Sequence, residues 1–231
     1  SQQGCSVAYS HMAATVYNNR AYVIGGLDKQ VGIECQVYTS ENNSWLFEFP
    51  SLPKGRFNSV CFVYRDSLYV FGGTDNSSNM NEIVRYDLST QNSGEWTTIA
   101  KVNEANQRGG VAFVVEDKVY AGLGEKSNGI RNGFYVSSDS LTKWELIPSI
   151  PAQLGVISSG VYDEQKKSFF MIDNDGKIWE YNLTTEQWTS RSLWIRMKNY
   201  HMFMLDGSIY ILGQDIYQKN KFTVYNPIWD N

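Results

Sequence analysis

The sequence predicts an all-β protein built from about five copies of a four-stranded antiparallel sheet. The composition is 42% hydrophobic and 14% aromatic, which argues against a disordered or fibrous chain. A strand-turn-strand pattern recurs every 40 to 51 residues, and a tryptophan follows each copy in the same phase. Small sheets repeated at this period are typical of a β-propeller, and the length suits a single domain over residues 1–231.

The first two strands of each repeat are expected to form a hairpin. The five copies are ATVYNNRAYVIGG (14–26), CFVYRDSLYVFGG (61–73), AFVVEDKVYAGLG (112–124), SGVYDEQKKSFFMID (159–173) and MFMLDGSIYILGQ (202–214). Turns such as Asn18-Asn19 and Asp206-Gly207 suit hairpins, because Asn, Asp and Gly tolerate the positive φ of two-residue turns. An aromatic residue in the second strand marks each copy: Tyr22, Tyr69, Tyr120, Phe170 and Tyr210.

The third and fourth strands of each repeat carry a second marker. A strand such as CQVYTSE, EIVRYDLST, GFYVSSD, KIWEYNLTT or FTVYNP follows each hairpin, and then comes Trp45, Trp96, Trp144, Trp188 or Trp229. The two markers place the blades at approximately 11–53, 54–102, 107–151, 154–193 and 196–229. Blades pack face to face, so their strands are apolar and their loops carry the polar residues.

These residues resemble the kelch family, whose blades carry a Gly-Gly doublet after the second strand, a Tyr in the third and a Trp opening the fourth. The matches in the first two blades are Gly25-Gly26, Tyr38 and Trp45, then Gly72-Gly73, Tyr86 and Trp96. The doublet is degenerate in the other three blades, although the resemblance extends from about His11 to Trp229. It implies a kelch-type β-propeller of about five four-stranded blades, which we expect to close by packing the fifth blade on the first.

The charge balance excludes some classes of partner. Lys and Arg number 20 against 24 Asp and Glu, giving a net charge of −4 without a basic stripe for nucleic acid. No apolar run is long enough to span a membrane. We expect a monomeric domain with a protein or glycan ligand and no cofactor. The Asn-, Tyr- and Trp-rich composition resembles extracytoplasmic kelch-like proteins of bacteria, which favours an extracytoplasmic or cell-surface location.

The two histidines, His11 and His201, fall near the first strands of the first and fifth blades. Ring closure would bring these blades together, so a ligand or metal between the histidines is conceivable. Zinc or copper needs further ligands that no spacing in the sequence supplies. We therefore include both histidines among the candidate ligand-binding residues and assign no metal site and no catalytic residue.

Three arginines, Arg56, Arg108 and Arg196, precede first strands and are candidates for a ligand-binding face around the channel. A guanidinium can bind a carboxylate through two parallel hydrogen bonds, as comparable arginines of kelch adaptor proteins do with acidic peptides. The alternative is that these arginines hold the preceding loop by bonding to carbonyl oxygens. The loops after the second strands, at 27–33, 74–82, 125–133 and 215–221, are further candidates.

The function that the sequence favours is a non-catalytic binding or scaffolding module that presents a loop face to a protein or glycan. The alternative is a carbohydrate-active or metal-dependent enzyme with its site at the channel mouth, similar to galactose oxidase or to a sugar mutarotase. An enzyme predicts perturbed ionisable groups that converge in one pocket, whereas a binding module predicts a broad exposed surface.

Overall fold

The computed structural model describes residues 9–227, except for 47–48, 91, 127–128, 131–132, 139, 151–158, 174, 195–196 and 216. The described residues form four four-stranded sheets, one three-stranded sheet and one small two-stranded sheet. The helices among them, η1 (Leu88–Thr90) and η2 (Asn103–Ala105), are single 3₁₀ turns, too short to cross a membrane. The all-β propeller of about five blades is confirmed, while the strand expected at Trp229 lies outside the described residues.

Each large sheet is one blade whose strands follow one another in the sequence. The first two blades are β1 (Ala13–Tyr17), β2 (Arg20–Ile24), β3 (Cys35–Thr39) and β4 (Ser44–Leu46), then β5 (Val60–Tyr64), β6 (Ser67–Phe71), β7 (Glu82–Asp87) and β8 (Thr97–Lys101). The third blade is β9 (Val111–Val115), β10 (Lys118–Gly122), β13 (Phe134–Ser138) and β14 (Glu145–Leu146), with β11 (Glu125–Lys126) and β12 (Gly129–Ile130) in its loop.

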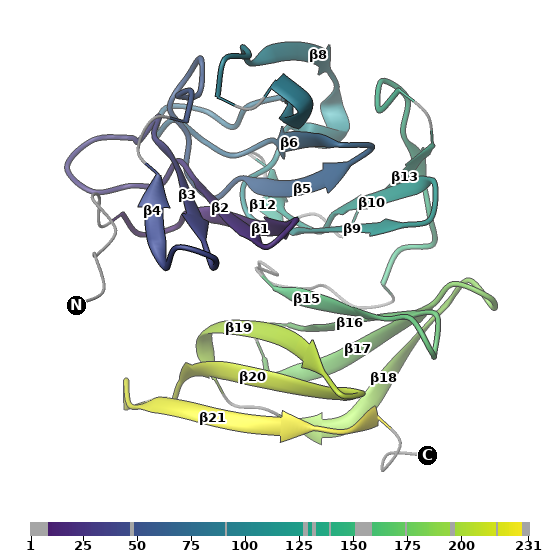
Figure 1. The fold of residues 1–231 in the computed structure, drawn as a ribbon. Coiled ribbons are helices and arrows are strands. Elements are labelled where there is room, and N and C mark those ends of the chain that lie inside the picture. Colours follow the sequence, from purple (N-terminus) through teal and green to yellow (C-terminus); the bar gives the residue numbers. More distant parts are fainter. Residues whose placement is uncertain are drawn as a thin grey trace.

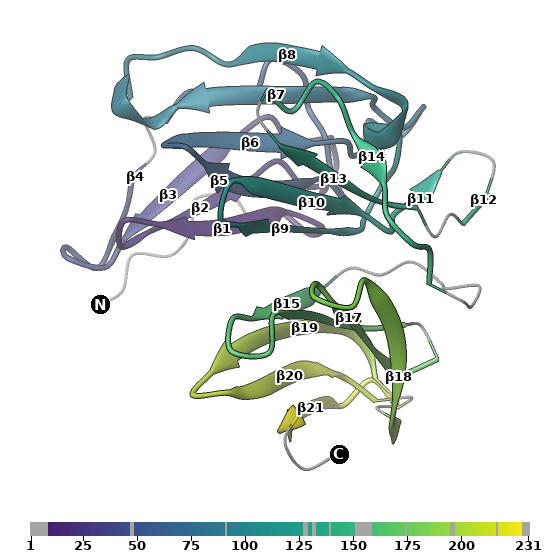
Figure 2. The ribbon, with the colours of Figure 1, turned by 90° about the vertical axis from the view of Figure 1, so that its right-hand side faces the viewer.

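The last two blades continue the same pattern. The fourth is β15 (Gly160–Asp163), β16 (Ser168–Ile172), β17 (Lys177–Asn182) and β18 (Gln187–Trp194), and the fifth is β19 (Lys198–Leu205), β20 (Ser208–Gln214) and β21 (Asn220–Tyr225). Figures 1 and 2 show the five blades in chain order around a centre, the first three in the upper half of each view and the last two below. The first strand of each blade is innermost.

The hairpin turns and the aromatic markers have the predicted conformations. Asn18 and Asn19 have φ of 47° and 59°, and Asp206 and Gly207 have φ of 49° and 71°. Each marker aromatic lies third in its strand and pairs with a residue of the preceding strand, as Tyr69 does with Phe62. Strands of period two place these aromatics on one face of each blade. The first four of them lie in the clusters that join their blade to the next one.

The hydrophobic core consists of four clusters, one at each junction between successive blades. Between the second and third blades, for example, Phe62, Tyr69 and Phe71 pack against Val119 and Ala121. The other three clusters join the first blade to the second, the third to the fourth, and the fourth to the fifth. Aromatic rings dominate these clusters because they fill the wedge between two twisted sheets at little cost in side-chain entropy.

In the part of the chain that the structure describes, the ring is open between the fifth blade and the first, contrary to the expected closure. Neighbouring inner strands are β1 with β5, β5 with β9, β9 with β15, and β15 with β19, whereas β19 and β1 are not such a pair. The side chains of Phe203, Leu212 and Phe222 on the fifth blade are 42%, 44% and 56% exposed. The residues at each junction fix the angle between two blades, and four such angles do not complete a circle here.

Candidate functional site

One end of the ring gathers the loops that the sequence marked as candidates. We call this end the loop face: it comprises the second-to-third-strand loops at 25–34, 72–81, 123–133 and 215–219, with the entry segments of the next blades at 53–59 and 102–110. Loop and entry segment are joined by single β-bridges between Phe57 and Thr74 and between Arg108 and Glu125. Each bridge lies within one blade, because the entry segment and the loop that it joins belong together to the second blade or to the third.

The glycine doublets connect the loop of one blade to the entry segment of the next. The N–H of Gly26 donates to the carbonyl of Arg56 at 2.9 Å, and the N–H of Gly73 donates in the same way to Gln107 at 2.8 Å. Gly25 has φ of +63°, and a Cβ there would lie 2.2 Å from the Arg56 carbonyl oxygen. The doublet thus combines a left-handed backbone with an approach too close for any side chain.

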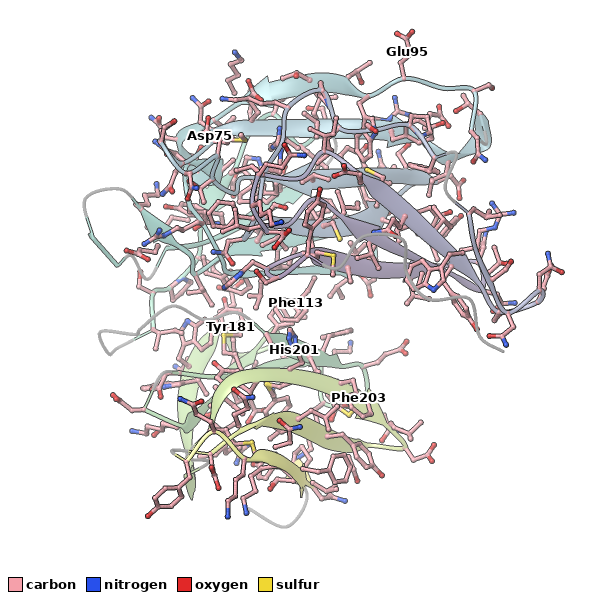
Figure 3. The ribbon with its side chains drawn as sticks, turned by 90° about the vertical axis from the view of Figure 1, so that its left-hand side faces the viewer. Asp75, Glu95, Phe113, Tyr181, His201 and Phe203 are labelled. Carbon is pink, nitrogen blue, oxygen red and sulfur yellow. The ribbon has the colours of Figure 1, made fainter. Side chains whose placement is uncertain are left out.

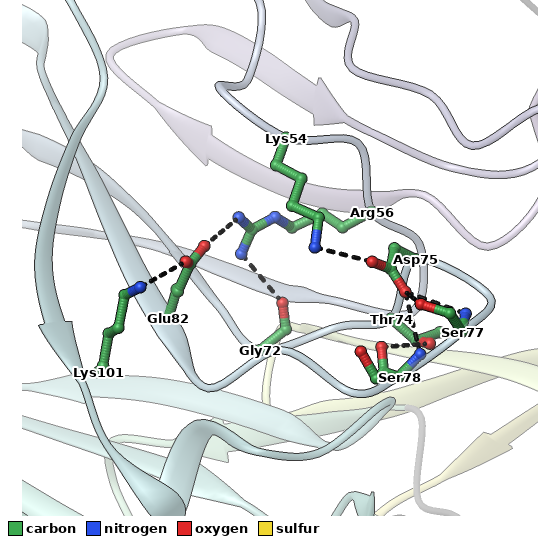
Figure 4. Close-up of polar contacts among 9 residues, drawn as sticks. All are labelled: Lys54, Arg56, Gly72, Thr74, Asp75, Ser77, Ser78, Glu82 and Lys101. Atoms are coloured by element: carbon green, nitrogen blue, oxygen red, sulfur yellow. Dashed lines mark hydrogen bonds and ion pairs between the residues drawn. The ribbon is translucent and has the colours of Figure 1, made fainter.

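Arg56 lies beneath the loop face, with none of its surface exposed. Its Nη1 donates to the carbonyl of Gly72 at 3.2 Å, and its Nη2 lies 3.4 Å from Oε2 of Glu82 (Figure 4). Burial lowers the pKa of Arg56, and the carboxylate of Glu82 opposes that shift. This arginine therefore holds a carbonyl of the loop after β6 in its own blade, whereas the structural alternative stated above placed the bonded carbonyls in the preceding loop.

Asp75 organises the loop of the second blade at the surface. Its Oδ1 accepts the N–H groups of Ser77 and Ser78, both at 3.0 Å, and its Oδ2 lies 2.7 Å from Nζ of Lys54 (Figure 4). Lys54, followed by the Ser77 hydroxyl and the Ser78 N–H, holds the pKa of Asp75 well below its usual range. The carboxylate therefore fixes the shape of the loop and the position of a lysine from the preceding segment.

Four ion pairs, on the loop face or at the strand ends that border it, share one arrangement in which the cation is more exposed than its carboxylate. The pairs are Lys54–Asp75, Lys101–Glu82, Arg108–Glu125 and Lys221–Asp215. The cationic side chains are 46 to 66% exposed, and the carboxylates 18 to 27%. Arg108 donates from both Nε and Nη2 to Oε2 of Glu125, at 3.0 and 2.9 Å.

Asp75→Asn tests the ion pair separately from the turn. Asparagine can still accept the two backbone N–H groups, so we expect a loss of about 1 kcal/mol at pH 7. Because the folded-state pKa is lowered, this contribution is complete above the ordinary carboxyl pKa of about 4 and declines as the pH falls below it. Urea unfolding at pH 7, 4 and 2.5 should show the two proteins converging in acid.

The control for overall charge is Asp117→Asn, which removes the same charge from a side chain that is 87% exposed. A stability difference between wild type and Asp75→Asn that stays constant down to pH 2.5 would contradict the assignment.

The central channel is a cavity of about 300 Å³ lined by the first strands of all five blades. Small residues such as Ala13, Ser59 and Gly160 form much of its wall. The ionisable side chains of this lining are His201 and Cys61, and burial raises the pKa of the Cys61 thiol. Among the described residues, no three of the types His, Cys, Asp and Glu gather in a way that could hold a metal ion.

The structure separates the residues that the sequence nominated. His201 lies in β19 and lines the channel, whereas His11 precedes β1 with φ of 57° and its Nδ1 lies 2.9 Å from the Ser10 hydroxyl. Arg56 is internal, Arg108 is on the loop face, and Arg196 lies outside the described residues.

Sequence reasoning missed Lys54 and Lys101, which belong to no repeat marker. The acidic residues within the candidate loops were the signal that could have pointed to these lysines. Each lysine pairs with a carboxylate from such a loop.

The family model of the KLHDC2/KLHL20/DRC7 Kelch-repeats domain matches residues 2–160. The chain is 27% identical over 165 residues to Kelch-like protein 36 of Mus musculus, covering 66% of this chain and 26% of that protein. It is 25% identical over 227 residues to Kelch repeat and BTB domain-containing protein 1 of Ectromelia virus, covering 93% of this chain and 39% of that protein. The chain thus spans about a quarter of the length of the first of these relatives.

Among solved structures, the fold is similar to that of YjhT, with a TM-score of 0.77 and 15% identity, over 94% of this chain and 84% of that one. This likeness shows the fold alone. The family model covers more than half of the chain and agrees with the doublets, the marker aromatics and the blades described above. The chain belongs to the kelch-repeat family of β-propellers.

Proposed function

We propose that this chain is a protein-interaction module whose loop face binds an acidic segment of a partner protein. The observation that carries the proposal is the shared arrangement of the four ion pairs, in which exposed cations stand over less exposed carboxylates. A carboxylate beneath each cation holds it in place, so less side-chain entropy is lost when a ligand binds. The net charge of the chain is −4, so this is a local feature.

The chemistry of these cations suits carboxylates better than neutral groups. A lysine ammonium has three donors and an arginine guanidinium five, and these donors diverge too much for all of them to reach the one carboxylate beneath. A second carboxylate from outside can therefore share each cation. Bonds between charged donors and acceptors are the strongest hydrogen bonds at a surface, and Arg108 offers the planar geometry that carboxylates match. A rigid propeller keeps such cations at fixed separations, which favours an extended acidic peptide.

The test uses a fluorescein-labelled peptide of twelve glutamates, with the corresponding glutamine peptide as the neutral probe. We expect anisotropy to report binding of the glutamate peptide alone, weakening as salt rises because the contact is between charges. Lys54→Glu and Arg108→Glu should each weaken binding about tenfold, since a charge-assisted hydrogen bond contributes about 1.5 kcal/mol.

The matched control is Lys118→Glu, which reverses an exposed lysine at the start of β10, at the opposite end of the same blade as Arg108. Equal losses for Lys118→Glu and the loop-face variants would mean that net charge alone drives binding, which contradicts the proposal. Binding of a glycan array at high salt, unchanged by the loop-face variants, would instead support the glycan ligand that the sequence left open.

A further inference from the structure

The outward face of the fifth blade is apolar, and no other blade among the described residues lies against it. We call it the terminal face; its residues are Phe203, Leu205, Tyr210, Leu212, Phe222 and Val224, drawn from β19, β20 and β21. The five besides Tyr210 are 40 to 56% exposed. The Phe203 ring stacks on the Tyr210 ring with centroids 5.2 Å apart, and the centroid of the Phe222 ring lies 5.6 Å from that of Tyr210. Figure 3 shows Phe203 and His201 on this blade, below the first three blades.

The terminal face repeats a surface that is buried elsewhere in the same molecule. Phe203 pairs with Tyr210 across β19 and β20 just as Phe62 pairs with Tyr69 across β5 and β6. The stacking is also the same, since Phe62 and Tyr69 have ring centroids 5.4 Å apart and an interplanar angle of 12°. Yet Phe62 is 4% exposed against 42% for Phe203. The difference is the third blade, which covers Phe62.

The covering surface at that junction is known in detail. Val119 and Ala121 of β10 lie against the aromatic face of the second blade, and neither is exposed. The complement of the terminal face is therefore the small-residue face of a following blade. An antiparallel sheet with branched or small side chains at these two positions would bury the terminal face in the same way.

The first blade has a small-residue face that is only partly covered among the described residues. With the marker aromatics Tyr22 and Tyr120 in register, Ala21 and Val23 correspond to Val119 and Ala121. Ala21 and Val23 are half-buried, and Val16 on the neighbouring strand is 72% exposed. The ring thus ends on one side with a face that needs a following blade and on the other with a face that needs a preceding one.

We propose that these two faces are the walls of a slot for one further four-stranded blade of the same repeat, carried by the same polypeptide. The fifth and first blades do not cover each other's exposed faces, because their inner strands β19 and β1 are not neighbours. The match to YjhT leaves about one sixth of that chain without a counterpart, comparable to one blade. The relatives are longer than the part this chain spans. Successive blades are all joined in sequence, so a blade on the same chain is favoured over a second molecule.

The first test compares Phe203→Ser with its matched control, Phe62→Ser, in the 231-residue chain. An uncovered terminal face predicts that Phe203→Ser changes the melting temperature by less than about 2 °C. Phe62→Ser should lower it by about 10 °C, because the same ring is buried at the second junction. Equal losses would show that the terminal face is already covered, which overturns the proposal.

The second test supplies a blade by extending the chain at its C-terminus with a copy of residues 107–151, the third blade. The copy brings its own Val119 and Ala121 to the terminal face. We expect amide hydrogen exchange in β20 and β21 to slow at least tenfold, and Phe203→Ser to become as destabilising as Phe62→Ser. The matched control carries Val119→Asp and Ala121→Asp in the copy alone, which places carboxylates against the aromatic rings.

Three outcomes would overturn the proposal. If the amides of β20 and β21 exchanged as slowly in an unextended monomer as in the extended chain, the five blades would close on themselves. Protection in an unextended dimer, seen by sedimentation, would mean that a second copy covers the face. Equal exchange in the two extended chains would mean that the added blade does not occupy the slot.

Discussion

Gly25→Ala is expected to be among the most destabilising single substitutions in the described chain, at about 4 kcal/mol. The left-handed backbone alone costs a residue with a Cβ about 1–2 kcal/mol. In addition, the Cβ would meet the Arg56 carbonyl oxygen at 2.2 Å. To remove this clash, the entry segment of the second blade would have to move, and the hydrogen bond from the Gly26 N–H to the same carbonyl would break. We expect the melting temperature to fall by about 10 °C.

Gly207→Ala separates the two contributions. Gly207 has φ of +71°, similar to Gly25, but no atom lies within 4 Å of the position of its Cβ. Its substitution should therefore cost only about 1 kcal/mol, the strain of the left-handed backbone. Thermal unfolding of both variants measures the difference. A similar loss at the two positions would show that the entry segment of the second blade is not closely packed on the doublet in solution.

Arg56→Met is expected to lose about 2–3 kcal/mol of stability, although it replaces a buried cation with an apolar side chain. Removing one partner of a buried ion pair leaves the remaining charge without its counter-charge. The stability lost in this way is usually greater than the stability that the pair contributed. Here the Gly72 carbonyl would lose a donor, and Glu82 would keep only the exposed Lys101. Arg56→Lys should recover less than half of the loss, because an ammonium cannot reach both acceptors as a guanidinium does.

Arg108→Met is the comparison on the surface. Its guanidinium is 46% exposed and its partner Glu125 accepts from it in an exposed setting, so the loss should stay below about 1 kcal/mol. Urea unfolding of the three variants gives these values, and peptide binding separates their roles. Stability unchanged in Arg56→Met, together with loss of peptide binding, would contradict the structural role assigned to Arg56.

The repeat was readable from the sequence because its markers are local. Tyr22, Tyr69, Tyr120 and Phe170 lie in one register, as their spacing indicated. The structure adds that they face the next blade. Closure was not readable, since it depends on the angles at four junctions, which arise from the fit of many side chains. An error of a few degrees at each junction is enough to open or close a ring.

The arginines show a similar limit within the candidate site. Counting back from Tyr69 and Tyr120 places Gln107, and not Arg108, at the position of Arg56, and both carbonyls accept from a doublet glycine. One residue along an extended segment turns a side chain to the opposite side. Arg56 therefore points inward and Arg108 outward, a distinction that residue type alone does not carry. The loops holding Asp75, Glu82 and Glu125 were nevertheless among those the sequence marked.

The junctions between sequence neighbours also shape how this molecule can assemble. Each of the four clusters joins residues that lie in adjacent repeats, so a blade can dock as soon as it and its predecessor have emerged from the ribosome. Joining the ends of a chain this long into a contact costs about (3/2)RT ln n in loop entropy. None of the four described junctions requires that cost, and it would fall only on the docking of the proposed further blade between the fifth and first blades.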